Sequence, residues 1–111
     1  MEITTQSFKH CDLIAISGRV DSFTAPKLNE AIEVSNKDGH YKIVLDLKKL
    51  EYMSSAGFRA LLVAQRNCKR YNRGEVVLAA VPKRIYDALE LTGFTPVFKI
   101  FEDNTSAVGY F

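Results

Sequence analysis

The feature that most restricts the fold is an alternation of strand-like and helix-like segments along the whole 111-residue chain. Two strand-like stretches, residues 3–8 and 13–17, come first, and the polar residues between them favour a hairpin. Helical patterns then alternate with apolar, strand-like stretches, which implies right-handed crossovers and parallel pairing. The sequence therefore predicts a single α/β domain over residues 1–111, with a mixed, mostly parallel β-sheet and helices packed on it.

The predicted order of elements is ββαβαβαβ, and the C-terminal tail after the last strand adds at most one short helix. The second strand ends at 18–21, and Ser22 or Thr24 can cap the first helix, which stops at Asp38-Gly39. Residues 42–47 have an apolar centre that suits a strand buried on both faces. A loop at 48–53 should lead into a helix at about 55–71, and a strand should follow at 75–81. We then expect a helix from Pro82 to Gly93, a strand at 97–101 and a last helical turn within 105–111.

The charge and hydropathy patterns argue against several classes of protein. A formal net charge of +2 is too small to favour a nucleic-acid or membrane partner. The first residues show no basic stretch followed by an apolar run, and no apolar stretch approaches the roughly 20 residues of a membrane span. Cys11 and Cys68 have no metal or redox spacing. We therefore expect a cytoplasmic protein with two reduced thiols in its core.

Ser54 and Ser55 lie where a loop gives way to a predicted helix. The N-terminus of a helix presents unpaired backbone N–H groups and a partial positive charge. A hydroxyl group there can simply cap the helix, and a phosphate group there is favoured by the same N–H groups. Both interpretations are open at this point.

The helical periodicity places Ser55 on an exposed face. At 100° per residue, the small and apolar residues after it cluster on the opposite side, and Phe58 falls on the boundary between the two faces. The exposed face predicted for this helix combines basic and apolar side chains: Ser55, Arg59, Leu62, Arg66 and Lys69. This composition suits a protein-binding surface better than a catalytic pocket.

A longer motif surrounds the two serines. The apolar strand at 43–47 leads through a short loop into Met53-Ser54-Ser55-Ala56-Gly57, and Gly18-Arg19-Val20-Asp21 followed by Thr24-Ala25 precedes the first helix. This combination resembles the STAS domain of anti-sigma-factor antagonists, small bacterial proteins that release a sigma factor by binding its inhibitory kinase. The resemblance covers nearly the whole chain.

The resemblance implies a phospho-switch at Ser55, two residues before the glycine, with Ser54 as a second candidate. It implies an anti-sigma-factor serine kinase and a metal-dependent serine phosphatase as partners, no cofactor or metal, and a monomer that pairs with the kinase. It places Asp21 and Thr24 in a loop beside the phosphorylation site. The expected partner-binding residues are Asp21, Thr24, Ser54, Ser55, Gly57, Phe58, Arg59, Leu62 and Arg66.

Three positions depart from the family pattern. Ser54 replaces the aspartate that often precedes the phosphoacceptor, and Arg59 stands where some members have a second glycine. The tail after Phe101 is short, so we expect the final helix of the family to be truncated or absent.

Other functions remain open from the sequence. The chain could be a STAS interaction module of a stress-signalling or transport assembly, without a phospho-switch. An enzyme with Ser55 as nucleophile would need a base, for which only His10 and His40 are available, and the segment lacks the Gly-x-Ser-x-Gly elbow. Nucleotide binding is disfavoured because Gly18-x-x-Asp21 lacks the spacing of phosphate-binding loops.

Overall fold

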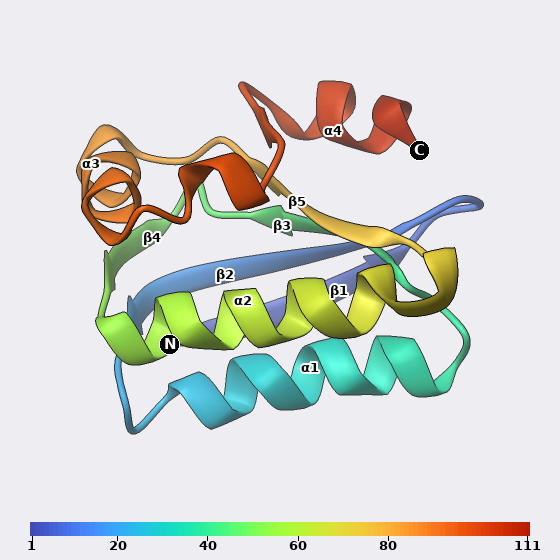
Figure 1. The fold of residues 1–111 in the computed structure, drawn as a ribbon, viewed down its shortest axis with the longest axis horizontal. Coiled ribbons are helices and arrows are strands. Elements are labelled where there is room, and N and C mark those ends of the chain that lie inside the picture. The colour runs from blue at the N-terminus through green and yellow to red at the C-terminus, as the bar shows by residue number, and fades with distance from the viewer.

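Six β-strands form one mixed sheet with helices packed on it (Figure 1). The computed structural model describes all residues from 1 to 111. The strands are β1 (Glu2–Ser7), β2 (Asp12–Val20), β3 (Lys42–Asp46), β4 (Leu50–Met53), β5 (Glu75–Ala79) and β6 (Ile100–Phe101). The helices are α1 (Ala25–Lys37), α2 (Ser55–Lys69), α3 (Lys83–Thr92) and α4 (Asn104–Tyr110), with 3-10 turns η1 (Arg70–Asn72) and η2 (Thr95–Val97). This arrangement confirms the predicted α/β class.

The sheet is organised around β2. This strand pairs antiparallel with β1, which confirms the predicted hairpin, and parallel with both β3 and β4. Beyond β3, the strands β5 and β6 continue the sheet in parallel. One strand reaches two successive partners because its register shifts between Gly18 and Arg19. Gly18 has a φ of +88°, a left-handed conformation that glycine adopts without strain.

The prediction of a loop over residues 48–53 is wrong for its last four residues. Leu50–Met53 forms β4, in which Leu50 and Met53 are buried while Glu51 and Tyr52 are exposed. Four residues with this pattern are too few to show strand periodicity in the sequence. The strand exists because β2 continues beyond the strand-like residues 13–17 as far as Val20 and offers β4 a partner.

Three other element boundaries also differ from the prediction. α2 ends at Lys69 rather than Tyr71, which has a φ of +59° in the turn that follows. β5 ends at Ala79, and β6 begins only at Ile100 because the preceding residues form the turn η2. Helix α3 ends as predicted at Gly93, whose φ of +77° is the left-handed conformation that often closes a helix.

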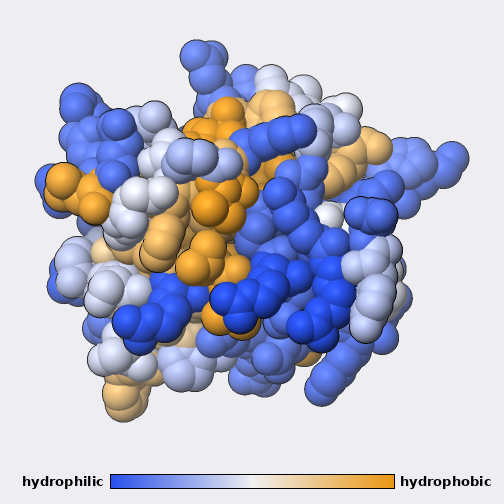
Figure 2. Space-filling model, viewed as in Figure 1, coloured by the Kyte–Doolittle hydropathy of each residue, from blue (hydrophilic) through white to orange (hydrophobic).

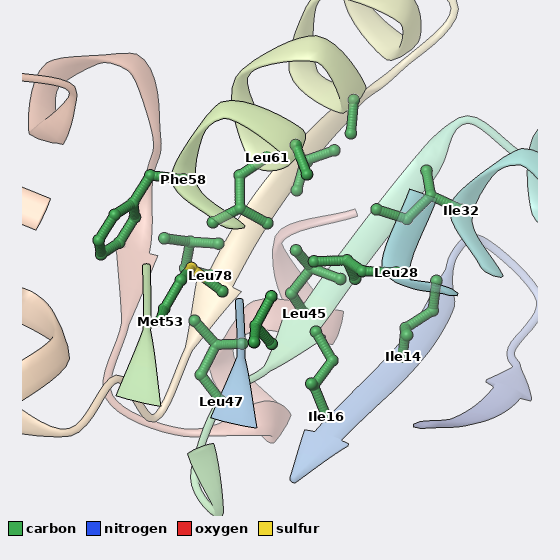
Figure 3. Close-up of a cluster of buried hydrophobic side chains, with 14 of the residues drawn as sticks. Ile14, Ile16, Leu28, Ile32, Leu45, Leu47, Met53, Phe58, Leu61 and Leu78 are labelled. Atoms are coloured by element: carbon green, nitrogen blue, oxygen red, sulfur yellow. The ribbon is translucent and has the colours of Figure 1, made fainter. Parts of the chain in front are cut away.

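The main core lies between the sheet and the pair of helices α1 and α2 (Figure 3). Leu28 and Ile32 of α1 and Leu61 of α2 lie over Ile14 and Leu45 of the sheet, and all five are at most 2% exposed. α1 and α2 run side by side on this face, and both begin at the end of the sheet where β2 ends (Figure 1). The core therefore fixes the start of α2 relative to the loop before α1.

A smaller cluster on the other face is covered by α4, where Ala107 is fully buried against Val44 and Val77. The carboxylate of Asp103 caps this helix by accepting a hydrogen bond of 2.7 Å from the Ser106 N–H. The final helix is therefore present rather than absent, as a capped helix of seven residues.

Gln65 is a buried polar residue that sequence reasoning missed. Its side chain accepts a hydrogen bond from Val76 N–H at 2.6 Å and donates to the carbonyl oxygens of Val76 and Val97 at 3.0 and 2.9 Å. Gln65 lies four residues after Leu61 and three before Cys68, so helical spacing places it on the apolar face of α2. This spacing could have predicted its burial from the sequence. One amide group therefore joins α2 to β5 and η2.

The two cysteines are free and buried, as predicted for small core residues. Burial raises the pKa of the Cys68 thiol to about 11. Among the helices, none combines the length and the apolar character that a bilayer crossing requires.

Candidate functional site

The start of α2 is attached to the end of β2. Ser54 has an extended backbone (φ −80°, ψ 174°), and its N–H donates a hydrogen bond of 2.8 Å to the Val20 carbonyl oxygen. Its own carbonyl oxygen accepts the first hydrogen bond of the helix, from Phe58 N–H at 3.1 Å. Ser55 is the first residue of α2, so its position is set by a strand on one side and a helix on the other.

The two serines differ in accessibility. The Ser54 Oγ atom is buried and has no hydrogen-bond partner, whereas Ser55 is exposed. Ser54 is the N-cap residue, but its side chain makes no cap hydrogen bond, and Ser55 lies one position inside the helix. The interpretation of these serines as simple caps is therefore wrong.

The beginning of α2 favours an anion. The first N–H group of α2 that makes a helical hydrogen bond is that of Phe58. The N–H groups of Ser55, Ala56 and Gly57 come before it and make no helical hydrogen bond. The first turn carries no acidic residue, and the exposed Arg59 lies four residues after Ser55. Free N–H groups, the helix dipole and a nearby guanidinium group all stabilise negative charge at this point.

The loop between β2 and α1 lies at the same end of the molecule (Figure 1) and is ordered by Asp21. The Asp21 carboxylate accepts hydrogen bonds from the N–H groups of Thr24 and Phe23 at 3.0 and 2.9 Å. The Thr24 hydroxyl in turn accepts from Asp21 N–H at 2.9 Å and lies 3.0 Å from the Arg19 carbonyl oxygen, to which it can donate. The bonds from Thr24 and Phe23 stabilise the charged form of this carboxylate and hold the pKa of Asp21 below its usual value.

Phe23, at the tip of this loop, is an exposed aromatic residue that the sequence reasoning overlooked. Its side chain is 85% exposed. The available signal was an aromatic residue inside a turn, between Asp21 and Thr24. Exposed aromatic side chains are enriched among the anchors of protein interfaces.

The exposed face of α2 is found as predicted. Arg59, Arg66 and Lys69 are exposed and Leu62 is partly exposed, in line with Ser55. Figure 2 shows strongly hydrophilic side chains gathered over α2, with an apolar band beside them. Cationic groups next to apolar surface suit contact with another protein.

Two of the predicted partner-binding residues belong to the core instead. Phe58 is 4% exposed and lies beside Met53 and Leu78 (Figure 3), so its side chain cannot contact a partner in this conformation. Gly57 is also buried. The prediction is corrected for both residues, and also for Ser54, whose Oγ atom is buried. The helical wheel placed Phe58 on a boundary, but β4, absent from the prediction, extends the buried face to reach it.

Gly57 is needed because the chain packs tightly there. A Cβ atom on Gly57 would lie 2.5 Å from Met53 Cγ and 2.9 Å from Val20 Cγ1, closer than such atoms can approach. We expect Gly57→Ala to lower the free energy of unfolding by about 1–3 kcal/mol, measured by equilibrium urea unfolding. In the control Gly109→Ala, within α4, the new Cβ meets nothing within 4 Å, so no loss is expected. Equal stability of Gly57→Ala and wild type would contradict this explanation.

The two histidines lie at the other end of the sheet from Ser55. His40 Nδ1 lies 3.1 Å from the Asp12 carboxylate, at the start of β2, and His10 lies in the turn just before it. Ser55 adjoins the opposite end of this nine-residue strand, roughly 25 Å away. A nucleophilic serine needs a base within hydrogen-bond reach, and neither imidazole satisfies that condition at Ser55.

Comparison with known proteins agrees with this geometry. The STAS domain family model matches residues 2–107. The anti-sigma-B factor antagonist of Listeria monocytogenes is 30% identical over 100 residues, covering 90% of this chain and 86% of the relative. An anti-sigma factor antagonist from Mycobacterium paratuberculosis has the same fold, with a TM-score of 0.86 at 21% identity over 98% of this chain and 92% of that one.

The anti-sigma factor antagonist SpoIIAA of Bacillus has been solved in two forms, and both share the fold at 14% identity. The unphosphorylated form gives a TM-score of 0.84 over 98% of this chain and 95% of SpoIIAA. The phosphorylated form gives 0.76 over 98% of each chain. From the family match over nearly its whole length and the relative at 30% identity, this chain belongs to the STAS domain family, together with the anti-sigma-factor antagonists that it resembles.

Proposed function

We propose that this chain is an anti-sigma-factor antagonist that binds an anti-sigma serine kinase and thereby frees a sigma factor. Phosphorylation of Ser55 by that kinase switches the binding off, and a metal-dependent serine phosphatase restores it. The observation that carries the proposal is the exposed Ser55 at the first position of α2, beside free N–H groups and Arg59. The named relatives support the general role, and one member of this fold, SpoIIAA, has been solved in a phosphorylated form.

Accessibility favours Ser55 over Ser54 as the phosphoacceptor. A kinase must bring the γ-phosphate of its nucleotide within bonding distance of the attacking oxygen. Ser54 Oγ is buried behind the start of α2, while Ser55 faces solvent. Modification of Ser54 would require the β2–α2 junction to open, including the hydrogen bond from Ser54 N–H to Val20.

The proposed kinase-binding surface consists of the Asp21–Thr24 loop and the exposed face of α2. Its members are Asp21, Phe23, Thr24, Ser55, Arg59, Leu62 and Arg66. The loop is held in shape by the Asp21 hydrogen bonds, so little ordering entropy is lost when it is covered. Because its partners regulate transcription, the proposed role places the chain in the cytoplasm.

Reconstitution with an anti-sigma factor and its sigma factor from the same organism tests the proposal. The unmodified chain should displace the sigma factor from the anti-sigma factor, as followed by size-exclusion chromatography of the labelled sigma factor. Addition of the phosphorylated chain should leave the complex intact. Failure of the unmodified chain to bind the anti-sigma factor, or to release the sigma factor, would overturn the proposed function.

A further inference from the structure

The two end strands of the main path through the sheet, β1 and β6, are protected very differently. The β6 edge is only two residues long, whereas β1 presents six residues, five of them exposed, along the opposite edge. Natural edge strands usually carry a lysine, a proline or a bulge that blocks pairing with another strand. β1 has none of these, and its pairing with β2 is regular from Glu2 to Ser7. Its outer row of backbone groups is therefore free to pair.

A groove of about 390 Å³ runs along this edge, between β1 and α1. Its floor includes Ile3 and Thr5 of β1, and its wall includes Ala31 and Val34 of α1. Val34 is 54% exposed, so an apolar side chain of α1 faces solvent beside the groove. The middle of the groove combines the apolar Ala31 and Val34 with the polar Thr5 and Glu30, and no element of the chain covers it.

The charges on α1 at the two ends of the groove are opposite, and a further carboxylate, Glu30, lines the groove one turn after Lys27. Lys27 lies at one end and Asp38 at the other, and neither forms an ion pair within the chain. Their separation of eleven residues along the helix is about 16 Å. The groove-lining β1 residues Ile3 to Ser7 span about 13 Å, with Thr5 at their centre. A two-fold axis through Thr5 and normal to the sheet would thus pass near the midpoint between Lys27 and Asp38.

We infer that a second copy of this chain docks on the β1 edge. The two β1 strands pair antiparallel and join both sheets into one, and the two α1 helices face each other in opposite directions. Ala31 and Val34 of each copy then meet across the axis, and Lys27 of one copy lies opposite Asp38 of the other. A two-fold interface requires such self-complementarity. This inference replaces the expectation of a monomer, and it is independent of the proposed function because Ser55 lies on α2, outside the groove.

The oligomeric state and its dependence on charge test the inference. Sedimentation equilibrium of the full chain, from about 10 to about 500 µM, should show a monomer–dimer equilibrium. In the Lys27→Glu variant, the new glutamate of each copy lies opposite Asp38 of the other copy. Because this repulsive pair occurs twice in a two-fold dimer, the variant should weaken association about tenfold. The double variant Lys27→Glu/Asp38→Lys restores the attraction and should recover most of the affinity. Arg84→Glu makes the same charge change on the exposed face of α3 and should leave association unchanged.

Hydrogen exchange identifies which edge is used. Amide groups of β1 should become more protected as the protein concentration rises, while those of β6 should not change. A chain that stays monomeric at about 500 µM overturns the inference. So does a dimer whose β1 amides exchange as in the monomer, or one that Lys27→Glu leaves as tight as wild type.

Discussion

Replacing Ser55 with aspartate is expected to weaken binding to the anti-sigma kinase by about 30-fold, measured by isothermal titration calorimetry. An unpaired charge in a packed interface costs about 2–5 kcal/mol. At 1.4 kcal/mol per decade this cost corresponds to roughly 30-fold to several thousand-fold. Aspartate carries a single charge and belongs at the lower end of this range. Phosphoserine carries about −1.5 to −2 charges and belongs at the upper end.

Two variants separate the effect of charge from other effects at Ser55. Ser55→Ala removes the hydroxyl without adding charge, so it should bind like wild type and resist inactivation by kinase and ATP. Ser106→Asp makes the same charge change in the first turn of α4, against the other face of the sheet, and should leave binding intact. Wild-type affinity of Ser55→Asp would contradict the switch, and so would a Ser106→Asp variant that is equally impaired.

Gln65→Leu is expected to lower the free energy of unfolding by about 2–5 kcal/mol, although leucine is similar in size and more apolar. In the wild-type chain the Gln65 amide hydrogen-bonds to Val76 N–H and to the carbonyl oxygens of Val76 and Val97. The substitution leaves these three backbone groups without a partner. Each buried polar group left without a partner costs about 1–3 kcal/mol. Apolar packing by the leucine offsets part of this loss.

Equilibrium urea unfolding, followed by circular dichroism, measures the effect. Arg66→Leu is the matched control, since it places leucine at the next position of α2, on the exposed face. It should change stability by no more than about 0.5 kcal/mol. A Gln65→Leu variant as stable as wild type would show that the amide contributes nothing that packing cannot replace.

The sequence predicts those parts of the fold in which each element carries its own signal. The amphipathic helices α1 and α2 and the apolar strands β3 and β5 have enough residues for their periodicity to show. β4 has only four residues and depends on β2 continuing past the register shift at Gly18, a tertiary event that no local pattern records. The burial of Phe58 follows from the same event, because β4 extends the surface against which α2 packs.

The candidate site was partly visible in the sequence for a similar reason. The position of Ser55 at a helix start, and the exposure of Arg59 and Arg66, follow from helical periodicity alone. The burial of Ser54 Oγ depends on the hydrogen bond that ties its backbone to Val20, on a strand more than 30 residues earlier. Gln65 was missed because a glutamine looks like a surface residue until its partners on β5 and η2 are in place.

Phosphosite mapping by tandem mass spectrometry tests the central claim most directly. The chain is incubated with the anti-sigma kinase and ATP, and the tryptic peptide from Leu50 to Arg59, which contains both serines, is fragmented. We expect one phosphate group, on Ser55, and none when Ser55→Ala is treated in the same way. Phosphate on Ser54, or a peptide that stays unmodified while the kinase is active, would contradict it.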